Sequence, residues 1–169
     1  MNIRLLESSD AKKYWDLRLE ALKENPEAFA QSYDEAIKRE NPIEGVAKNI
    51  SSNGNFTFGA FKGEELVGVV TLLQETSIKL KHRANILGMY VSPQMRGLSI
   101  GEELLLIAIK KAKSIETLEK VNLTVVTTNV AAKNLYEKLG FKIFGLEEQA
   151  LKVHDEYYDE NYMVLILND

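Results

Sequence analysis

Residues 83–126 constrain the fold most strongly, because they predict two strands joined through a loop and a long helix. Residues 83–91 form the first predicted strand, residues 92–99 are rich in loop formers, and residues 100–115 place apolar side chains at helical spacing. Residues 121–126, Val-Asn-Leu-Thr-Val-Val, are typical of a buried strand. Two strands connected in this way are expected to lie parallel in one sheet, with a right-handed crossover.

The junction between the loop and the helix in this unit predicts an anion site. The stretch QMRGLSIGEELL contains two glycines, a fixed cation and a hydroxyl, at Arg96, Gly97, Ser99 and Gly101. A helix start leaves backbone N–H groups unpaired and carries the positive end of the helix dipole, which suits a pyrophosphate. A flexible strand-to-helix loop is the alternative. The run has neither the Gly-Lys-Ser/Thr of a Walker loop nor the glycine spacing of a dinucleotide fingerprint.

Composition limits the function classes. The chain has 169 residues, of which 45% are hydrophobic and 27% charged, as expected for one globular domain over residues 1–169. A net charge of -4 argues against a nucleic-acid partner. The lack of cysteine excludes disulfides, thiolate nucleophiles and cysteine zinc sites, and His82 and His154 are isolated, so no metal site is predicted. No apolar run approaches a membrane span, so a cytoplasmic protein without a membrane partner is expected.

The other predicted elements surround this central unit. Further helices are expected at about residues 11–24 and 42–50 and after Asn129, with an irregular or partly helical stretch between the first two. The further predicted strands are residues 3–6, 56–61, 66–73, 142–146 and about 158–167.

A second segment decides between the readings of the loop. The sequence NVAAKNLYEKLGF predicts a helix capped by Asn129, with Tyr136 on its inner face and Gly140 as its stop. Together with VSPQMRGLSIGEELL, it resembles the two signature segments of the GNAT superfamily, the acyl-CoA-dependent N-acetyltransferases. The resemblance implies an α/β (α+β) fold with a mixed, mostly antiparallel sheet of six to seven strands and about four helices. The sheet should be splayed at its central parallel strand pair.

The resemblance also implies a binding site for acetyl-CoA as co-substrate. Backbone N–H groups of the loop would line the pyrophosphate, and main-chain groups at the end of the preceding strand would meet the pantetheine arm and the thioester. Ser99 stands where the family usually has glycine, and a positive φ would strain a serine. Asn129 and Asn134 match positions that contact pantetheine or nucleotide, although Asn129 is equally well explained as a helix cap. The implied cofactor-binding residues are Met89, Tyr90, Val91, Arg96, Gly97, Leu98, Ser99, Ile100, Gly101, Asn129 and Asn134.

Two residues are candidates for catalysis. Tyr136 matches the tyrosine often assigned as general acid toward the departing thiolate, whereas outside this motif it would be read as a core aromatic. Direct attack of the amine on the thioester needs a base or an ordered water chain. Glu75 is the candidate base, with Gln74, Asn85 and Tyr33 as further candidates near the acceptor, and a solubilising carboxylate is the alternative. Without cysteine, transfer in a ternary complex is favoured over an acetyl-cysteine intermediate.

The acceptor side carries less information. The stretch ALKENPEAFAQSYDEA resembles the family's segment that walls the acceptor pocket, which implies substrate-binding roles for Phe29, Ser32 and Tyr33, or ordinary packing. The expected acceptor is a primary amine of a small molecule, an amino acid or a protein N-terminus. A homodimer is left open by the resemblance. The alternative functions are a catalytically inactive acyl-CoA sensor and a domain that binds ATP or a dinucleotide.

Overall fold

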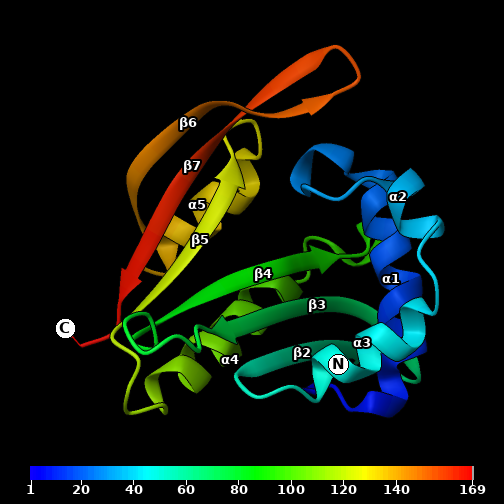
Figure 1. Cartoon of the computed structure of the whole chain (residues 1–169), viewed down its shortest axis with the longest axis horizontal. Helices are drawn as coiled ribbons and strands as arrows, with labels where there is room; N and C mark the ends of the chain where they lie inside the picture. The colour runs from blue at the N-terminus through cyan, green and yellow to red at the C-terminus, as the bar shows by residue number, and fades with distance from the viewer. Residues whose placement is uncertain (169) are drawn as a thin grey trace.

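The computed structural model describes residues 1–168 and contains a seven-stranded sheet with the order β1-β2-β3-β4-β5-β7-β6 (Figure 1). Only β4 and β5 pair in parallel within the described residues, as predicted from the crossover unit. The strands are β1 (Asn2–Leu5), β2 (Asn55–Lys62), β3 (Glu65–Gln74), β4 (Arg83–Val91), β5 (Lys120–Val126), β6 (Lys142–Val153) and β7 (Glu156–Ile166). The predicted mixed, mostly antiparallel sheet is therefore confirmed.

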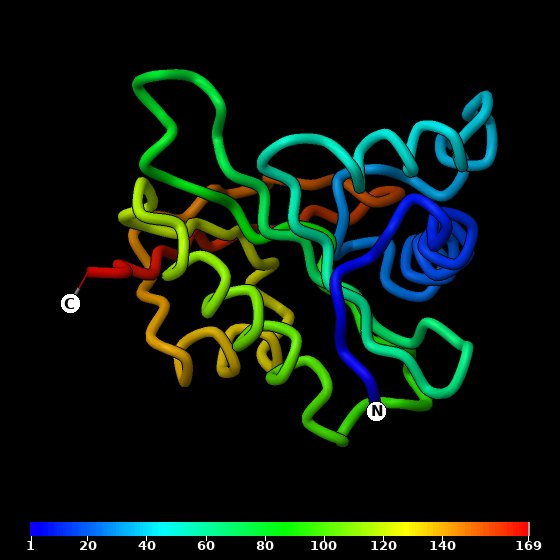
Figure 2. Tube along the Cα trace, turned by 90° about the horizontal axis from the view of Figure 1, so that it is seen from below, coloured from blue at the N-terminus to red at the C-terminus, as the bar shows by residue number. Residues whose placement is uncertain are grey.

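The helices cover both faces of the sheet (Figure 2). They are α1 (Ala11–Glu24), α2 (Tyr33–Ile37), α3 (Pro42–Ile50), α4 (Ile100–Lys113) and α5 (Val130–Lys138), with short 3₁₀ helices η1 (Ser8–Asp10), η2 (Pro26–Ala28) and η3 (Pro93–Met95). The short α2 lies in the stretch that was predicted to be irregular or partly helical. Within residues 1–168, none of the helices combines the length and apolarity that crossing a bilayer requires.

The largest core lies between α4 and the sheet. Apolar side chains of α4 recur at helical spacing, and Leu104, Leu105 and Ala108 are fully buried against β2 and β3. On the other face, Leu17 and Ala21 of α1 pack in a second cluster with side chains of β2, β3 and β4. Two separate cores therefore hold α1 and α4 on opposite faces.

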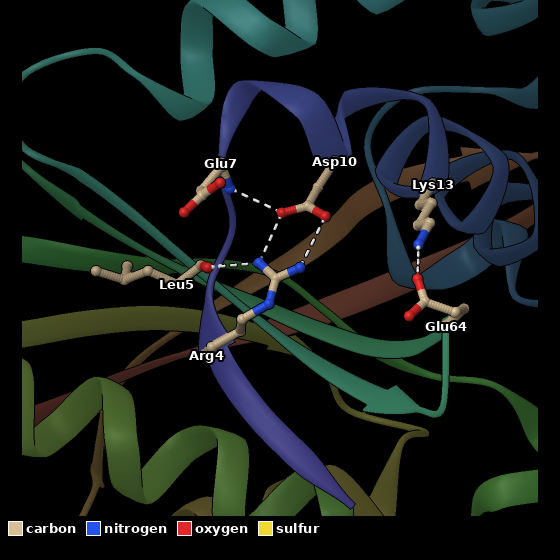
Figure 3. Close-up of polar contacts among 6 residues, drawn as sticks. All are labelled: Arg4, Leu5, Glu7, Asp10, Lys13 and Glu64. Atoms are coloured by element: carbon tan, nitrogen blue, oxygen red, sulfur yellow. Dashed lines mark hydrogen bonds and ion pairs between the residues drawn. The ribbon is translucent and has the colours of Figure 1, made fainter.

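The start of α1 is fixed to the edge strand β1 by a bidentate ion pair (Figure 3). Arg4 Nη1 and Nη2 donate to Asp10 Oδ2 and Oδ1 over 2.7 and 2.9 Å, and the backbone N–H of Glu7 donates to Asp10 Oδ2 over 2.8 Å. Asp10 is buried, and its hydrogen bond from Arg4 is the main cause that lowers its pKa. This clamp sets where α1 begins over the sheet.

The closing hairpin is longer than predicted. We expected the first closing strand to end at residue 146, but β6 continues to Val153 and the chain then turns at His154 with a φ of 55°. Most residues of β6 are exposed, and its pairing with β7 shifts register between Glu147 and Leu151. A strand of this kind does not need a regular alternation of polar and apolar residues, which is the signal that predicts a strand from sequence. Figure 1 shows the hairpin extending past the end of the other strands.

Candidate functional site

The two parallel strands separate soon after they meet. Arg83 pairs with Lys120 and Asn85 with Asn122, but no pairing between β4 and β5 continues past Asn85 in the described residues. Beyond this point β5 is paired with β7 alone, while β4 stays paired with β3 (Figure 1). The predicted splay is confirmed, and it opens the middle of the sheet.

A bulge in β4 faces this opening. Tyr90 pairs with Val69 and Leu87 pairs with Thr71, so Gly88 and Met89 together face the single residue of β3 between them. Gly88 has a φ of +58°, a conformation that glycine adopts readily. The bulge turns the backbone of β4 at the point where it has no partner in β5. A lone glycine inside the predicted strand was the available sequence signal for it.

A cleft of about 750 Å³ runs from this opening across the face of the sheet covered by α1 and α3. Gly88, Met89, Asn129 and Tyr136 lie among its lining residues where β4 and β5 separate. Other lining residues come from α1, from η2 and the segment after it, from α3 and the loops beside it, and from the strands β2 to β7.

Tyr136 projects from α5 toward the bulge. Its hydroxyl donates to Met89 Sδ over 3.5 Å, and its ring packs edge-on against Phe141 with centroids 5.9 Å apart. Burial raises the pKa of Tyr136 to about 12, so the hydroxyl keeps its proton at neutral pH. A thioether is a weak acceptor. The hydroxyl can therefore turn to a better acceptor placed in the opening.

The loop before α4 presents backbone donors. Within residues 1–168, the backbone N–H groups from Gly97 to Glu102 donate to no backbone carbonyl. Gly97 has a φ of +76°, and Ser99, the N-cap of α4, has a φ of 61° with no capping bond from its hydroxyl. Free N–H groups at the start of a long helix form an anion site.

Gly101 lies where α4 approaches β4 closely. A Cβ on Gly101 would stand 3.3 Å from Met89 Cε, so α4 begins in close contact with the bulged strand. The neighbouring Glu102 is paired with Lys138 of α5 over 2.7 Å. This pair offsets a negative charge beside the start of α4.

Arg96 is engaged in positioning the loop. Its backbone N–H donates to the carbonyl of Pro93 over 3.2 Å, so it is not among the free donors that we expected there. Its guanidinium donates to the Val91 carbonyl over 3.0 Å and to Asn25 Oδ1 over 2.9 Å. The Arg96 side chain thus ties the loop to the end of β4 and to the residue that follows α1, and it already occupies the Val91 carbonyl.

Comparisons with known proteins agree with this geometry. The family described as the acetyltransferase (GNAT) family matches residues 14–141. The chain belongs to the GNAT acetyltransferase family. A GNAT acetyltransferase from Streptococcus pneumoniae shares 24% identity, with a TM-score of 0.88 over 99% of each chain.

Two further solved structures with lower identity share the fold. The protein yncA of Salmonella typhimurium, described as a putative acetyltransferase and solved with its cofactor acetyl-CoA, is 18% identical with a TM-score of 0.84, over 100% of this chain and 95% of that chain. NAA60 of Arabidopsis thaliana, solved with a bisubstrate analogue, is 18% identical with a TM-score of 0.73, over 99% of this chain and 98% of that chain. Among curated proteins, none matches the chain significantly.

The other cofactor residues expected from the GNAT motifs differ in their surroundings. Asn129 caps α5 by accepting from the backbone N–H of Ala132 over 3.2 Å, and it also lines the cleft. Asn134 is exposed on α5 and does not line the cleft. The side chain of Tyr90 faces α1, where its hydroxyl donates to Glu20 Oε1 over 3.0 Å.

Glu75, expected as the base, is not brought to the cleft of this GNAT domain. It accepts from Asn85 Nδ2 over 3.1 Å and lies 3.8 Å from Arg83 Nη2, near the beginning of β4. Gln74 is engaged there too, donating to the Lys81 carbonyl and to Thr117. These polar side chains connect the ends of strands and loops.

The expected acceptor residues divide between two hollows. Phe29 lines the main cleft and packs edge-on against Tyr90, with ring centroids 6.5 Å apart. Ser32 caps α2 through reciprocal hydrogen bonds with Glu35. Ser32 and Tyr33 line a neighbouring hollow of about 430 Å³ beside the turn of the closing hairpin, and Phe29 lines both hollows.

Several polar residues that line the cleft were not predicted from the sequence, among them Tyr14, Arg18, Arg39 and Glu160. Glu160 of β7 is the only carboxylate among the residues that line this cleft within residues 1–168. Burial raises the pKa of Glu160, and the nearby charge of Glu147 raises it further. A carboxylate with these surroundings can take up a proton more readily than an exposed one.

Proposed function

We propose that this GNAT protein transfers the acetyl group of acetyl-CoA to a primary amine by direct attack in a ternary complex. The observation that carries the proposal is the opening between β4 and β5, with the bulge at Gly88 and Met89 on one side and the Tyr136 hydroxyl on Met89 Sδ. An acetyl-CoA complex of a protein with the same fold supports acetyl-CoA as the co-substrate.

The free N–H groups from Gly97 to Glu102 would hold the pyrophosphate of acetyl-CoA at the start of α4. The pantetheine arm would then lie between the splayed strands, as an extended chain beside β4. This arrangement leaves the thioester at Gly88 and Met89, within reach of Tyr136.

Glu160 is the candidate base on the cleft wall. An amine is mostly protonated at neutral pH and must lose a proton before or during its attack on the thioester carbonyl. The raised pKa of Glu160 favours proton uptake by this carboxylate, directly or through water. As the new C–N bond forms and the C–S bond breaks, the electron pair of the C–S bond leaves on sulfur.

Tyr136 acts in this scheme mainly as a hydrogen-bond donor to the departing thiolate. A hydroxyl with a pKa of about 12 is a weaker acid than a thiol, whose pKa is about 8.5, so full transfer of its proton is uphill. A hydrogen bond to the sulfur still stabilises the charge that develops there. The protonated amine loses two protons in becoming an amide. One of them restores the thiol through the solvent, and the other is released to the solvent.

Acetyl-CoA turnover with a panel of primary amines, followed by mass spectrometry of the products, tests the proposal. We expect release of CoA together with an N-acetylated amine. Tight binding of acetyl-CoA without turnover of any amine would instead support a sensor. Failure to bind acetyl-CoA would contradict both functions.

A further inference from the structure

Arg18 lies on the wall of the cleft, one turn along α1 from Tyr14. Tyr14 and Arg18 are four residues apart and therefore lie on the same face of the helix, and both line the cleft. The Tyr14 hydroxyl stands 3.7 Å from where a Cβ on Gly88 would be, so this face of α1 reaches the bulge. The next turn of the same face, about 5.4 Å further along the helix, carries Arg18.

The guanidinium of Arg18 has few partners in the protein. Its plane packs over the ring of Phe29 at 4.6 Å, and Nη2 donates to Gln31 Oε1 over 3.5 Å, the outer limit of a hydrogen bond. None of the ion pairs within residues 1–168 involves Arg18. Burial lowers the pKa of Arg18, since the charge has lost water without gaining a carboxylate.

The distribution of charge around the cleft is opposite to that of the whole chain. The chain carries a net charge of -4, yet the charged residues that line the cleft within residues 1–168 are two arginines, Arg18 and Arg39, and one carboxylate, Glu160. An arginine presents a planar fork of donors that matches a carboxylate. Glu160, in turn, suits the amine.

We propose that the acceptor is a small amine that also carries a carboxylate, such as an amino acid, with its carboxylate on Arg18. This inference rests on the proposed acetyl transfer, since it places the amine between Glu160 and the bulge. A polyamine would meet an unpaired guanidinium in this position, which disfavours it.

Competitive retention by the CoA-saturated protein tests the proposal without requiring turnover. The probe is a mixture of the twenty N-acetylated amino acids, compared with the same compounds as C-terminal amides, in equilibrium dialysis with mass spectrometry. We expect at least one acid to be retained about tenfold or more above its amide by the wild-type protein. Arg18→Gln should abolish the difference, and Arg18→Lys, which keeps the charge without the fork, should retain part of it.

Lys12→Gln is the matched control, because it removes one positive charge from the exposed side of α1, where Lys12 pairs with Asp16. It should leave the preference for the acid unchanged. Equal or undetectable retention of acids and amides by the wild-type protein, or a preference that survives in Arg18→Gln, would overturn the inference. CoA binding is measured in the same samples. If the wild-type protein does not bind CoA, the proposed acetyl transfer is rejected, and not only the inference about Arg18.

Discussion

The hydroxyl of Tyr136 donates to Met89 Sδ over 3.5 Å, and this contact links α5 to the bulge of β4 across the opening in the sheet. The tyrosine is buried and protonated at neutral pH, while its acceptor is weak. The position therefore suits a donor whose hydrogen bond can move from the Met89 thioether to the thiolate sulfur during the reaction.

Tyr136→Phe should lower kcat about 100-fold, because it removes the hydrogen bond to the developing thiolate. The fold and the affinity for acetyl-CoA should change little, since only a weak bond to sulfur is lost. Steady-state kinetics with calorimetry of acetyl-CoA binding separate the two effects. An unchanged kcat would remove Tyr136 from the mechanism.

The pH profile of kcat tests Glu160. A protonated carboxyl cannot accept a proton, so kcat should rise as Glu160 ionises, with a midpoint above 4.5, the usual value for glutamate, because its pKa is raised. Glu160→Gln should lower kcat by about 100-fold and remove this limb of the profile. Glu147→Gln should move the midpoint to lower pH, because the charge of Glu147 contributes to the raised pKa.

Glu75→Gln is the comparison for Glu160→Gln. The Glu75 carboxylate lies beside Asn85 and Arg83 and does not line the cleft, so kcat should stay within about twofold of the wild-type value. The reverse result, an inactive Glu75 variant beside an active Glu160 variant, would reassign the base.

Gly97→Glu should weaken acetyl-CoA binding by about tenfold or more, because it places one negative charge beside the negatively charged pyrophosphate. The position has a φ of +76°, and no atom lies within 4 Å of an added Cβ, so the new side chain meets the φ strain and no steric clash. Gly97→Ala carries the same strain without the charge and should bind more tightly than Gly97→Glu. Equal affinities for Gly97→Glu and the wild type, measured by calorimetry, would place the pyrophosphate elsewhere.

Asp10→Asn should destabilise the fold by about 2 kcal/mol at pH 7, because it breaks the bidentate pair with Arg4. The pKa of Asp10 is lowered in the folded state, so this stabilisation is present above the ordinary carboxyl pKa and is lost as pH falls through the lowered one. Urea unfolding at pH 7 and pH 3 should show the difference shrinking at pH 3. Asp16→Asn, which breaks an exposed pair with Lys12, should cost no more than about 0.5 kcal/mol at either pH.

The crossover unit could be predicted because its signals are local. The helical spacing of Leu104, Leu105 and Ala108 and the β-branched run of β5 each specify an element without reference to the rest of the chain. A parallel pair and an anion site at the start of the helix follow from that order. The outer half of β6 carried no such pattern, since none of its residues is buried and the strand is paired on one side only within the described residues.

Tyr14, Arg18 and Glu160 could not be predicted as residues of the cleft, because their position depends on how separate elements dock. Tyr14 and Arg18 belong to a helix that the sequence predicts, but only the packing of α1 over the sheet turns them into the cleft. Glu160 faces the cleft because of the pairing of β7 with β5, in which it stands opposite Val126. Nothing in the sequence favoured Glu160 over Glu75, yet Glu75 lies beside Arg83 at the beginning of β4, away from the bulge.

A crystal structure of the protein with acetyl-CoA tests most directly whether the opening between β4 and β5 is a thioester site. We expect the pyrophosphate to accept hydrogen bonds from the N–H groups of residues 97–102 and the thioester sulfur to lie beside the Tyr136 hydroxyl. Acetyl-CoA bound elsewhere, or bound with its sulfur away from Tyr136 and the bulge, would contradict the assignment.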